Sequence, residues 1–191
     1  YVVSIAAITN VASAILINPE IIDRIVVVWL GGHALDWPNN KEYNLYQDIA
    51  AARIIFGCGA ALVQLPCMGV VSAFTVSGPE LEAHLRGKNK LCDYLVDFTT
   101  QEAKACGGGI AWSRPIWDVT AVGWLLGTGL MNDRIEYAPT PEYDDRYSYR
   151  KNGKVVIIDS NKGKLVLKEK TNQFVFLKKT EEEIEFEIET K

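Results

Sequence analysis

The sequence predicts an α/β protein in which a mostly parallel sheet flanked by helices is followed by a small antiparallel β meander. Up to about residue 150, short apolar runs alternate with segments of helical periodicity, which is typical of βα units around a parallel sheet. After that point, short segments alternate apolar and polar residues between turn signals, which indicates antiparallel strands. We therefore divide the chain into an α/β domain over residues 1–150 and a β-rich appendage over residues 151–191.

Three strands are predicted in the first domain, over residues 1–8, 24–30 and 61–65. Each is a short apolar run, as expected for strands that are covered on both faces. A helix should follow the first strand, with Thr9 or Asn10 as its cap, and it should end before Pro19. A buried strand at the very first residue suggests that the chain is the C-terminal part of a longer polypeptide.

Residues typical of helix starts and ends lie between these strands and after the last of them. Asp48 is placed to cap a helix over residues 49–56 that Gly57 or Gly59 would end. The sequence Ser-Gly-Pro-Glu at 77–80 is a capping box that opens a helix ending at Gly87. After it we expect a helix whose apolar face is formed by Leu91, Tyr94, Leu95 and Phe98. A glycine loop at 107–109 should follow, and then a last apolar helix from Pro115 to about Leu126.

The appendage is predicted to contain four strands with one apolar face and one Lys/Glu face. Asn-Gly at 152–153, together with the turn residues at 161–163 and 171–172, should separate them. No residue type that supports catalysis is clustered there, so we expect a structural or interaction role. The four strands are expected at residues 154–159, 164–169, 173–178 and 184–189.

The composition excludes several classes of function. The 191 residues carry a net charge of -4, with an isoelectric point near 5.3, which argues against a surface that binds nucleic-acid phosphates. No apolar run is long enough to span a membrane. The four cysteines lack the spacing of a metal site, and as reduced core residues they favour a cytoplasmic protein.

A polar loop follows the second predicted strand, and it contains the first candidate site. In GGHALDWPNNKEYN (31–44), Glu42 and Asn44 are two residues apart, so in an extended segment both side chains would point the same way. A carboxylate beside an amide suits the vicinal hydroxyls of a sugar, and the loop would lie beyond the carboxyl ends of parallel strands. A solvated loop with Asx-turns would explain the same residues.

A second candidate is Asp118, in the sequence SRPIWD (113–118). Expected in the first turn of a helix, its carboxylate would be favoured there by the helix dipole alone. At a junction between strand and helix it could also bind a hard cation, provided that other strand ends supply further oxygen ligands. Thr9 lies at one such end.

Several segments of the first 147 residues resemble the nucleoside hydrolase family of the inosine-uridine-preferring type, which are calcium-dependent N-ribohydrolases. The most specific feature is EYN at 42–44 followed by an Asp-capped, alanine-rich helix, where the family has Glu-Phe-Asn, a short spacer and a similar helix. The other segments are AITNVASAILINPE (7–20), RIVVVWLGG (24–32), YQDIAAARIIF (46–56), CDYLVDF (92–98) and IWDVTAVGWLL (116–126).

The resemblance implies roles for individual residues. Thr9 aligns with the threonine whose backbone carbonyl binds calcium, and Asp118 with an aspartate ligand of the same ion. Glu42 and Asn44 align with the pair that binds the ribose hydroxyls. Asp36 falls where the family usually has an asparagine that also contacts the ribose.

Two further positions differ from the family pattern. Leu30 stands where a methionine lines the sugar pocket. Trp117 replaces a histidine that is proposed to help the leaving base depart. The Asp-rich N-terminal loop (Asp-x-Asp-x-Gly-x-Asp-Asp), which supplies most calcium ligands and the general base, has no counterpart in this sequence.

The resemblance therefore implies a purine or pyrimidine nucleoside hydrolase that releases ribose and a free base with a calcium-bound water. Because calcium takes about six to eight oxygen ligands, the isolated chain should be inactive without the missing segment. The alternative is a non-catalytic module that binds ribose or nucleosides, or another protein, on the hydrolase scaffold. The expected partners are a small nucleoside and further copies of the chain, with no nucleic-acid polymer and no membrane.

Overall fold

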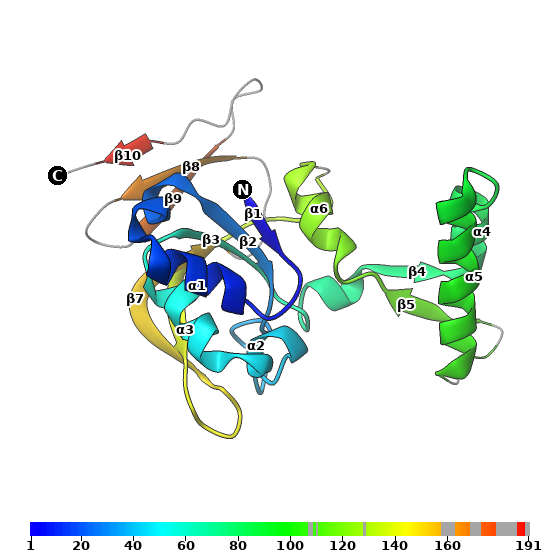
Figure 1. Cartoon of the computed structure of the whole chain (residues 1–191), viewed down its shortest axis with the longest axis horizontal. Coiled ribbons are helices and arrows are strands. Elements are labelled where there is room, and N and C mark those ends of the chain that lie inside the picture. Colours follow the sequence, from blue (N-terminus) through cyan, green and yellow to red (C-terminus); the bar gives the residue numbers. More distant parts are fainter. Residues whose placement is uncertain are drawn as a thin grey trace.

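The computed structural model describes residues 1–106, 109, 111–127, 129–157, 163–168, 173–178 and 187–189. Most elements surround one twisted sheet, and a narrow arm extends from it (Figure 1). Within this part of the chain, no helix combines the length and the apolar character needed to cross a bilayer.

The main sheet contains five strands in the order β1-β2-β3-β7-β6. Strands β1 (Val2–Ser4), β2 (Val26–Leu30) and β3 (Ala61–Leu65) run parallel to one another. Strand β7 (Tyr149–Ile157) continues parallel to β3, and β6 (Ile135–Pro141) closes the sheet antiparallel to β7. The predicted fold class is confirmed.

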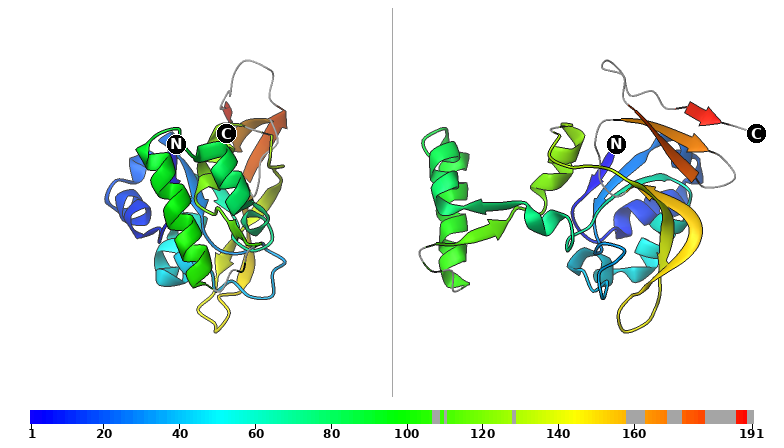
Figure 2. Two further views of the ribbon diagram at one scale, coloured as in Figure 1. Left: turned by 90° about the vertical axis from the view of Figure 1, so that its right-hand side faces the viewer. Right: turned by 180° about the vertical axis from the view of Figure 1, so that it is seen from behind.

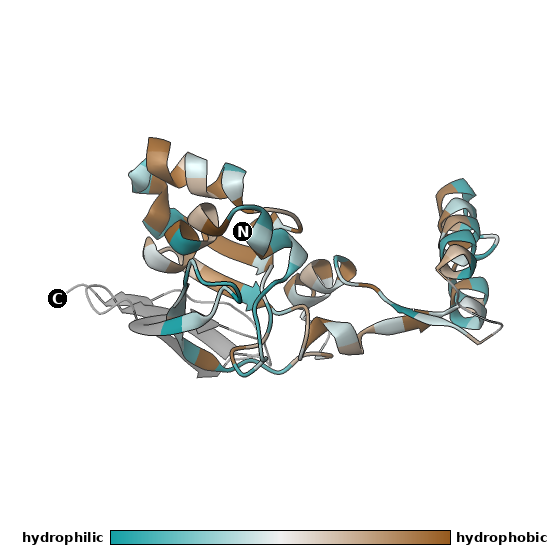
Figure 3. Cartoon of the chain, turned by 90° about the horizontal axis from the view of Figure 1, so that it is seen from below, coloured by the Kyte–Doolittle hydropathy of each residue, from teal (hydrophilic) through white to brown (hydrophobic). Residues whose placement is uncertain are grey.

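Helices cover both faces of the sheet, as the all-buried β2 and β3 require. On one face lie α1 (Thr9–Ile17) and α3 (Ile49–Gly57), whose buried residues pack against Trp29 and Leu62. On the other face, Ala121 of α6 (Val119–Leu125) packs against Val26 and Val28. Figure 3 shows the apolar residues concentrated in the central strands. Two short 3-10 helices, Pro19–Arg24 and Val71–Ala73, connect these elements.

The arm is formed by an antiparallel pair, β4 (Thr75–Ser77) and β5 (Ser113–Pro115), that leads to two packed helices. These are α4 (Gly78–Leu85) and α5 (Lys90–Ala105), which lie apart from the sheet in Figure 1 and in the right-hand view of Figure 2. The predicted capping box is confirmed, since the Ser77 backbone N–H and hydroxyl both donate to Glu80. The predicted apolar face of α5 is exposed to solvent; it comprises Leu91, Tyr94, Leu95 and Phe98.

Several predicted element boundaries are wrong. Strand β1 is shorter than residues 1–8 and lies at the sheet's edge, so Val3 is exposed rather than buried. Helix α1 has Ile8 at its N-cap and no side-chain cap, because the Thr9 hydroxyl instead donates to Asp48. The last helix begins at Val119, since residues 113–115 pair with β4 as strand β5.

The predicted antiparallel meander is also partly wrong. Its first strand belongs to β7 of the main sheet, and the Asn-Gly at 152–153 lies at a bulge opposite Ala138 and Pro139 rather than in a turn. Strands β8 (Gly163–Lys168) and β9 (Gln173–Lys178) pair antiparallel, but β10 (Glu187–Glu189) pairs parallel to β8. The alternation of apolar and polar residues identified these strands, but it could not identify the strand with which each one pairs. The predicted glycine loop at 107–109 and the turns at 161–163 and 171–172 fall mostly outside the described residues.

Candidate functional site

Buried polar side chains meet where β2 and β3 end, next to the turn at Gly31 and Gly32. We call this group the strand-end cluster. It includes residues from β3, from the polar loop, from α2 (Tyr43–Gln47) and from β7, so the fold brings together positions far apart in the sequence. Its members are His33, Asn40, Glu42, Asn44, Gln64 and the hydroxyl of Tyr149.

Glu42 is the centre of the cluster and is only 4% exposed. Its Oε2 accepts hydrogen bonds from the backbone N–H groups of Gly32 at 2.8 Å and Leu45 at 2.9 Å, and its Oε1 accepts from Asn44 at 2.9 Å. Burial raises the pKa of Glu42, and these backbone donors partly offset the increase. The carboxylate therefore fastens the glycine turn to the start of α2.

The extended segment considered for Glu42 and Asn44 is not formed, because residues 43–47 are helical. Glu42 is the N-cap of α2, and Asn44 lies within the helix. The two side chains nevertheless reach the same region, because Glu42 caps the helix while the Asn44 amide Nδ2 donates to the carbonyl of Leu30 at 2.9 Å. The Leu30 side chain is buried on the opposite face of the sheet, so Leu30 contributes its carbonyl to this cluster.

Two amide side chains line the same turn. The Asn40 Oδ1 accepts from His33 N–H at 2.7 Å, and the Gln64 Nε2 donates to Gly31 O at 2.8 Å and to the Tyr149 hydroxyl at 2.9 Å. Burial raises the pKa of Tyr149, and both amides oppose the increase. In the described structure, Gln64 Oε1 and Asn40 Nδ2 are buried without a well-formed hydrogen bond. Such atoms usually have a partner, so the cluster has unused capacity for a polar ligand or water.

The sequence pattern did not identify His33, Gln64 or Tyr149 as members of this cluster. Gln64 carried a usable signal, because it is a lone polar residue in the apolar run ALVQL (61–65). Tyr149 carried none, because it reaches the cluster only through the pairing of β7 with β3.

Trp117 approaches the cluster through Cys67. A hydrogen bond from Trp117 lowers the pKa of the Cys67 thiol, whereas burial and the charge of Glu42 raise it by more. Cys67 itself follows β3, and its N–H donates to Gly32 O at 2.8 Å. The structure thus places Trp117, Glu42 and Asn44 around the same strand ends, while Asp36 lies exposed on the loop.

His33 is held as a neutral imidazole. Its Nδ1 accepts a hydrogen bond from the Met68 backbone N–H at 3.2 Å, and burial lowers its pKa. A lowered pKa means that the stability this group contributes is complete above the unfolded value, about 6.5, and is lost as the pH falls through the folded value.

We therefore expect acidification from pH 7.5 to pH 5 to destabilise the protein partly through His33. Replacing His33 with glutamine should reduce this acid-induced loss, because glutamine does not titrate and the lowered pKa of His33 no longer contributes. Urea unfolding at both pH values measures the difference. His84 is exposed on α4, so His84→Gln is the matched control and should leave the acid-induced loss unchanged. An equal loss in His33→Gln and the unmodified protein would contradict the assignment.

The two predicted calcium ligands lie at the starts of α1 and α6. The Thr9 hydroxyl donates to Asp48 at 2.6 Å, and Asp48 caps α3. Asp118 is the N-cap residue of α6 and makes no capping hydrogen bond, and burial raises its pKa. Among the described residues, no group of three or more His, Cys, Asp or Glu side chains could hold a metal ion. These residues alone do not fit calcium, which takes six to eight oxygen ligands.

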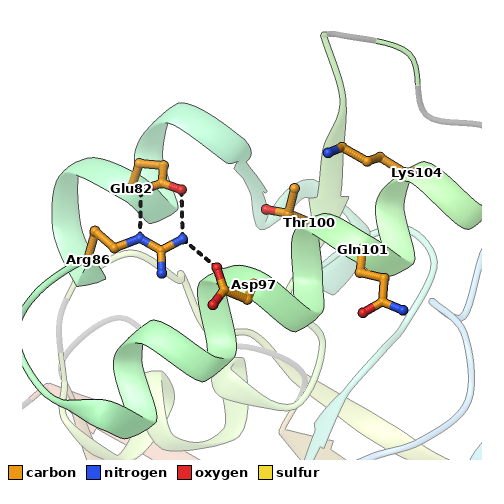
Figure 4. A pocket seen from close by; sticks show the side chains of 6 residues that line it. All are labelled: Glu82, Arg86, Asp97, Thr100, Gln101 and Lys104. Carbon is orange, nitrogen blue, oxygen red and sulfur yellow. Dashed lines mark hydrogen bonds and ion pairs between the residues drawn. The ribbon is translucent and has the colours of Figure 1, made fainter.

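A groove of about 320 Å³ lies elsewhere, between the arm helices (Figure 4). The Arg86 guanidinium donates to Glu82 at 2.9 Å and to Asp97 at 2.7 Å, so its charge is neutralised within the protein. The groove is open and far from the strand ends (Figure 1). Its ion pairs join α4 to α5, and the carboxylates of Glu82 and Asp97 both accept from Arg86.

Comparisons with known proteins agree with the sheet and its helices. A plant nucleoside hydrolase (PpNRh1) has a similar structure, with a TM-score of 0.65 and 20% identity over 83% of this chain and 57% of that chain. A purine-preferring ribonucleoside hydrolase from Gardnerella vaginalis gives a TM-score of 0.60 at 22% identity, over 82% and 49% of the two chains. These likenesses establish the fold.

The sequence comparisons extend the agreement to the family. The pyrimidine-specific ribonucleoside hydrolase RihB of Escherichia coli is 28% identical over 135 residues, which are 65% of this chain and 41% of that protein. This chain thus spans less than half the length of that curated relative. The model of the inosine-uridine preferring nucleoside hydrolases matches residues 1–189. Because the match covers nearly the whole sequence, the chain belongs to the inosine-uridine preferring nucleoside hydrolase family.

Proposed function

We propose that this chain forms the ribose-binding part of an N-ribohydrolase, which cleaves the N-glycosidic bond of ribonucleosides to ribose and a free base. The strand-end cluster carries the proposal. It places a buried carboxylate and an amide beyond the carboxyl ends of parallel strands, where ligands bind in open α/β sheets. Because the chain belongs to a nucleoside hydrolase family, the ligand that we propose for this cluster is the ribose of a nucleoside.

In this proposal, Glu42 and Asn44 hold the sugar. A carboxylate has about four acceptor sites and a side-chain amide can both donate and accept, so each can bond to a ribose hydroxyl in addition to its bonds within the protein. Cleavage passes through a transition state with positive charge on the sugar ring. The fixed negative charge of Glu42 would favour that state, because the carboxylate is already oriented by backbone N–H groups.

Trp117 would contact the leaving base without protonating it. An indole has only an N–H donor and does not titrate in the physiological range, unlike the histidine that the family resemblance places here. The leaving base must therefore receive its proton from another group or from water. The preference of the enzyme for purine or pyrimidine nucleosides is tested in the experiment below. The similar proteins differ in this property, since one is named pyrimidine-specific and another purine-preferring.

We further propose that calcium binds only when polypeptide outside these 191 residues supplies most of its ligands and the general base. The support is the donor set of the described residues, which contains no group of three or more His, Cys, Asp or Glu side chains that could hold a metal ion. The isolated chain is then expected to release no ribose.

A chimera tests the proposal. Residues 1–147 replace the matching region of the E. coli relative, and ribose release from inosine and from uridine is measured with calcium or a chelator. We expect calcium-dependent release from at least one substrate, and Glu42→Gln should lower kcat/KM by roughly 100-fold to 1,000-fold, as for loss of one preoriented electrostatic group. The exposed Glu80→Gln on the arm is the control. A chimera that folds, as judged by circular dichroism, but cleaves neither substrate would contradict the proposal.

The second candidate is a non-catalytic ribose-binding or nucleoside-binding module. It is favoured by the strand-end cluster, in which Asn40 Nδ2 and Gln64 Oε1 are buried without a well-formed hydrogen bond, whereas the described residues contain no group of three or more side chains that could hold a metal ion. Calorimetric titration of the isolated chain with ribose and uridine separates the two functions. Calcium-independent binding that Glu42→Gln abolishes, combined with an inactive folded chimera, would establish the binding module.

A further inference from the structure

The peptide group between Gly31 and Gly32 is held at both ends by buried side chains. Its carbonyl oxygen, Gly31 O, accepts a hydrogen bond from Gln64 Nε2 at 2.8 Å, and its N–H, that of Gly32, donates to Glu42 Oε2 at 2.8 Å. Among the described residues no peptide bond is cis, and the oxygen and the N–H of a trans peptide group point in opposite directions within one plane. Gln64 therefore controls the direction in which the N–H reaches Glu42.

The two glycines give this peptide group little restraint of their own. Glycine adopts positive and negative φ about equally readily, and Gly32 has φ +75°. Rotation of the peptide group would withdraw its N–H from Glu42 and its oxygen from Gln64. The hydrogen bond from Gln64 opposes that rotation, so the orientation of the turn depends on how firmly the Gln64 amide is held.

The Gln64 amide is held through its nitrogen. Nε2 donates to the Tyr149 hydroxyl at 2.9 Å as well as to Gly31 O, whereas Oε1 is buried without a well-formed hydrogen bond in the described structure. Loss of the hydroxyl would leave a buried N–H without this acceptor, which is unfavourable. The amide could then rotate away from Gly31 O, and the turn would lose its restraint.

Tyr149 is fixed by contacts outside the glycine turn. It begins strand β7, and its ring lies edge-on to the ring of Phe56 of α3, with 5.8 Å between the centroids. The turn between β6 and β7 also contacts the polar loop, because the Asn40 N–H donates to Arg146 O at 2.8 Å. The packing of β7 therefore places the hydroxyl independently of the bond that it makes to Gln64.

The surroundings of Gly32 show that these groups meet at one point. A Cβ added at Gly32 would lie within 3.0 Å of the Tyr149 hydroxyl, Gln64 Nε2 and Asn40 Oδ1. Asn40 Oδ1 also accepts from the N–H of the next residue, His33, at 2.7 Å. The hydroxyl and the two amides thus enclose the turn that supplies an N–H to Glu42.

We propose that Gln64 and Tyr149 are positioning residues of the ribose site, which hold the peptide group between Gly31 and Gly32 so that its N–H orients the Glu42 carboxylate. The inference rests on the proposed function, in which Glu42 binds the sugar and favours positive charge on it. An electrostatic group of this kind is most effective when it is oriented in advance. Loss of the restraint should therefore lower the rate of cleavage more than the affinity for the nucleoside.

Amide hydrogen exchange in the 191-residue chain, followed by NMR, tests the positioning directly. Tyr149→Phe removes only the hydroxyl, and Gln64→Met removes the amide with little change in length. Both should raise the exchange rate of the Gly32 amide by roughly tenfold or more, because its hydrogen bond opens more often. The amides of β2 and β3 should keep their rates.

Tyr137→Phe is the matched control, because Tyr137 lies in the neighbouring strand β6 and is 51% exposed. It should leave the exchange of Gly32 and of the central strands unchanged. An unchanged Gly32 rate in both test variants would overturn the proposal. Equal acceleration in β2 and β3 would overturn it too, because the two residues would then support the fold in general and not the turn.

The kinetic test uses a chimera that extends to residue 157, so that it includes β7. Tyr149→Phe should lower kcat by roughly tenfold to 100-fold, as for a small misplacement of a group at the reacting centre, and KM should change little. In a chimera that already carries Glu42→Gln, Tyr149→Phe should have no further effect, because it acts through Glu42.

An unchanged kcat, or losses that multiply in the double variant, would overturn the proposal. An unmodified chimera that folds but releases no ribose counts against the proposed function alone. Amide exchange in the 191-residue chain still decides in that case whether Gln64 and Tyr149 position the turn, because it is measured without catalysis.

Discussion

Replacement of Glu42 with alanine is expected to lower the free energy of unfolding by about 3–5 kcal/mol. The change removes the acceptor of three backbone N–H groups, those of Gly32, Asn44 and Leu45. Each buried donor left without a partner costs roughly 1–3 kcal/mol, and relaxation of the loop would recover part of the sum. Urea unfolding monitored by circular dichroism measures the effect.

Glu80→Ala is the matched control for this substitution. Glu80 also accepts from a helix-capping position, through the backbone N–H and hydroxyl of Ser77, but it is exposed on the arm. Loss of a capping interaction at such an exposed site should cost much less than loss of a buried acceptor of three N–H groups. If Glu42→Ala cost no more than Glu80→Ala, the carboxylate would not fasten the turn to α2 as described.

Replacement of Gly32 with alanine should also be strongly destabilising, by about 2–5 kcal/mol. Gly32 has φ +75°, a left-handed conformation that costs a residue with a Cβ roughly 1–2 kcal/mol. The added Cβ would also meet the Tyr149 hydroxyl, Gln64 Nε2 at 2.8 Å and Asn40 Oδ1 at 3.0 Å, and overpacking of this kind costs about 1–3 kcal/mol.

Gly57→Ala provides the comparison. Gly57 ends α3, has no positive φ, and nothing lies within 4 Å of the Cβ that alanine would add. Alanine there should be neutral or stabilising by up to about 1 kcal/mol, because it reduces the freedom of the unfolded chain. Thermal and urea unfolding of both variants should therefore give opposite results, and similar losses at the two glycines would show that Gly32 is not constrained by the cluster.

The polar loop shows how far local reasoning extended into the candidate site. Its composition indicated hydrogen bonding at the end of a strand, and Glu42 and Asn44 do lie together. The reason was wrong, however, because the segment is the start of a helix and not an extended strand. Glutamate is an uncommon N-cap, and it is stabilised here by the N–H of Gly32, ten residues earlier in the sequence. A contact of this kind has no signature in local periodicity.

The strands near the two ends of the chain show that sequence patterns also failed to predict which strands pair. The apolar pattern of residues 1–8 predicted a buried strand, but the pairing places β1 at the edge of the sheet. The alternation after residue 150 indicated strands, but β7 joins the main sheet between β3 and β6. Side-chain periodicity reports which faces of a strand are covered, and it does not report which strand lies beside it.

The sequence by itself determined the α/β class, strands β2 and β3, the Asp48 and Ser77 caps, and the family resemblance around residues 42–44. These features depend on hydrophobic periodicity and on hydrogen bonds between residues close in the chain. The tertiary structure alone decided that Gln64 and Tyr149 meet at the glycine turn, and that Tyr1 contacts Trp124 of α6. Those relations join residues separated by 85 positions or more, and they arise only when the strands pair and the buried polar groups find partners.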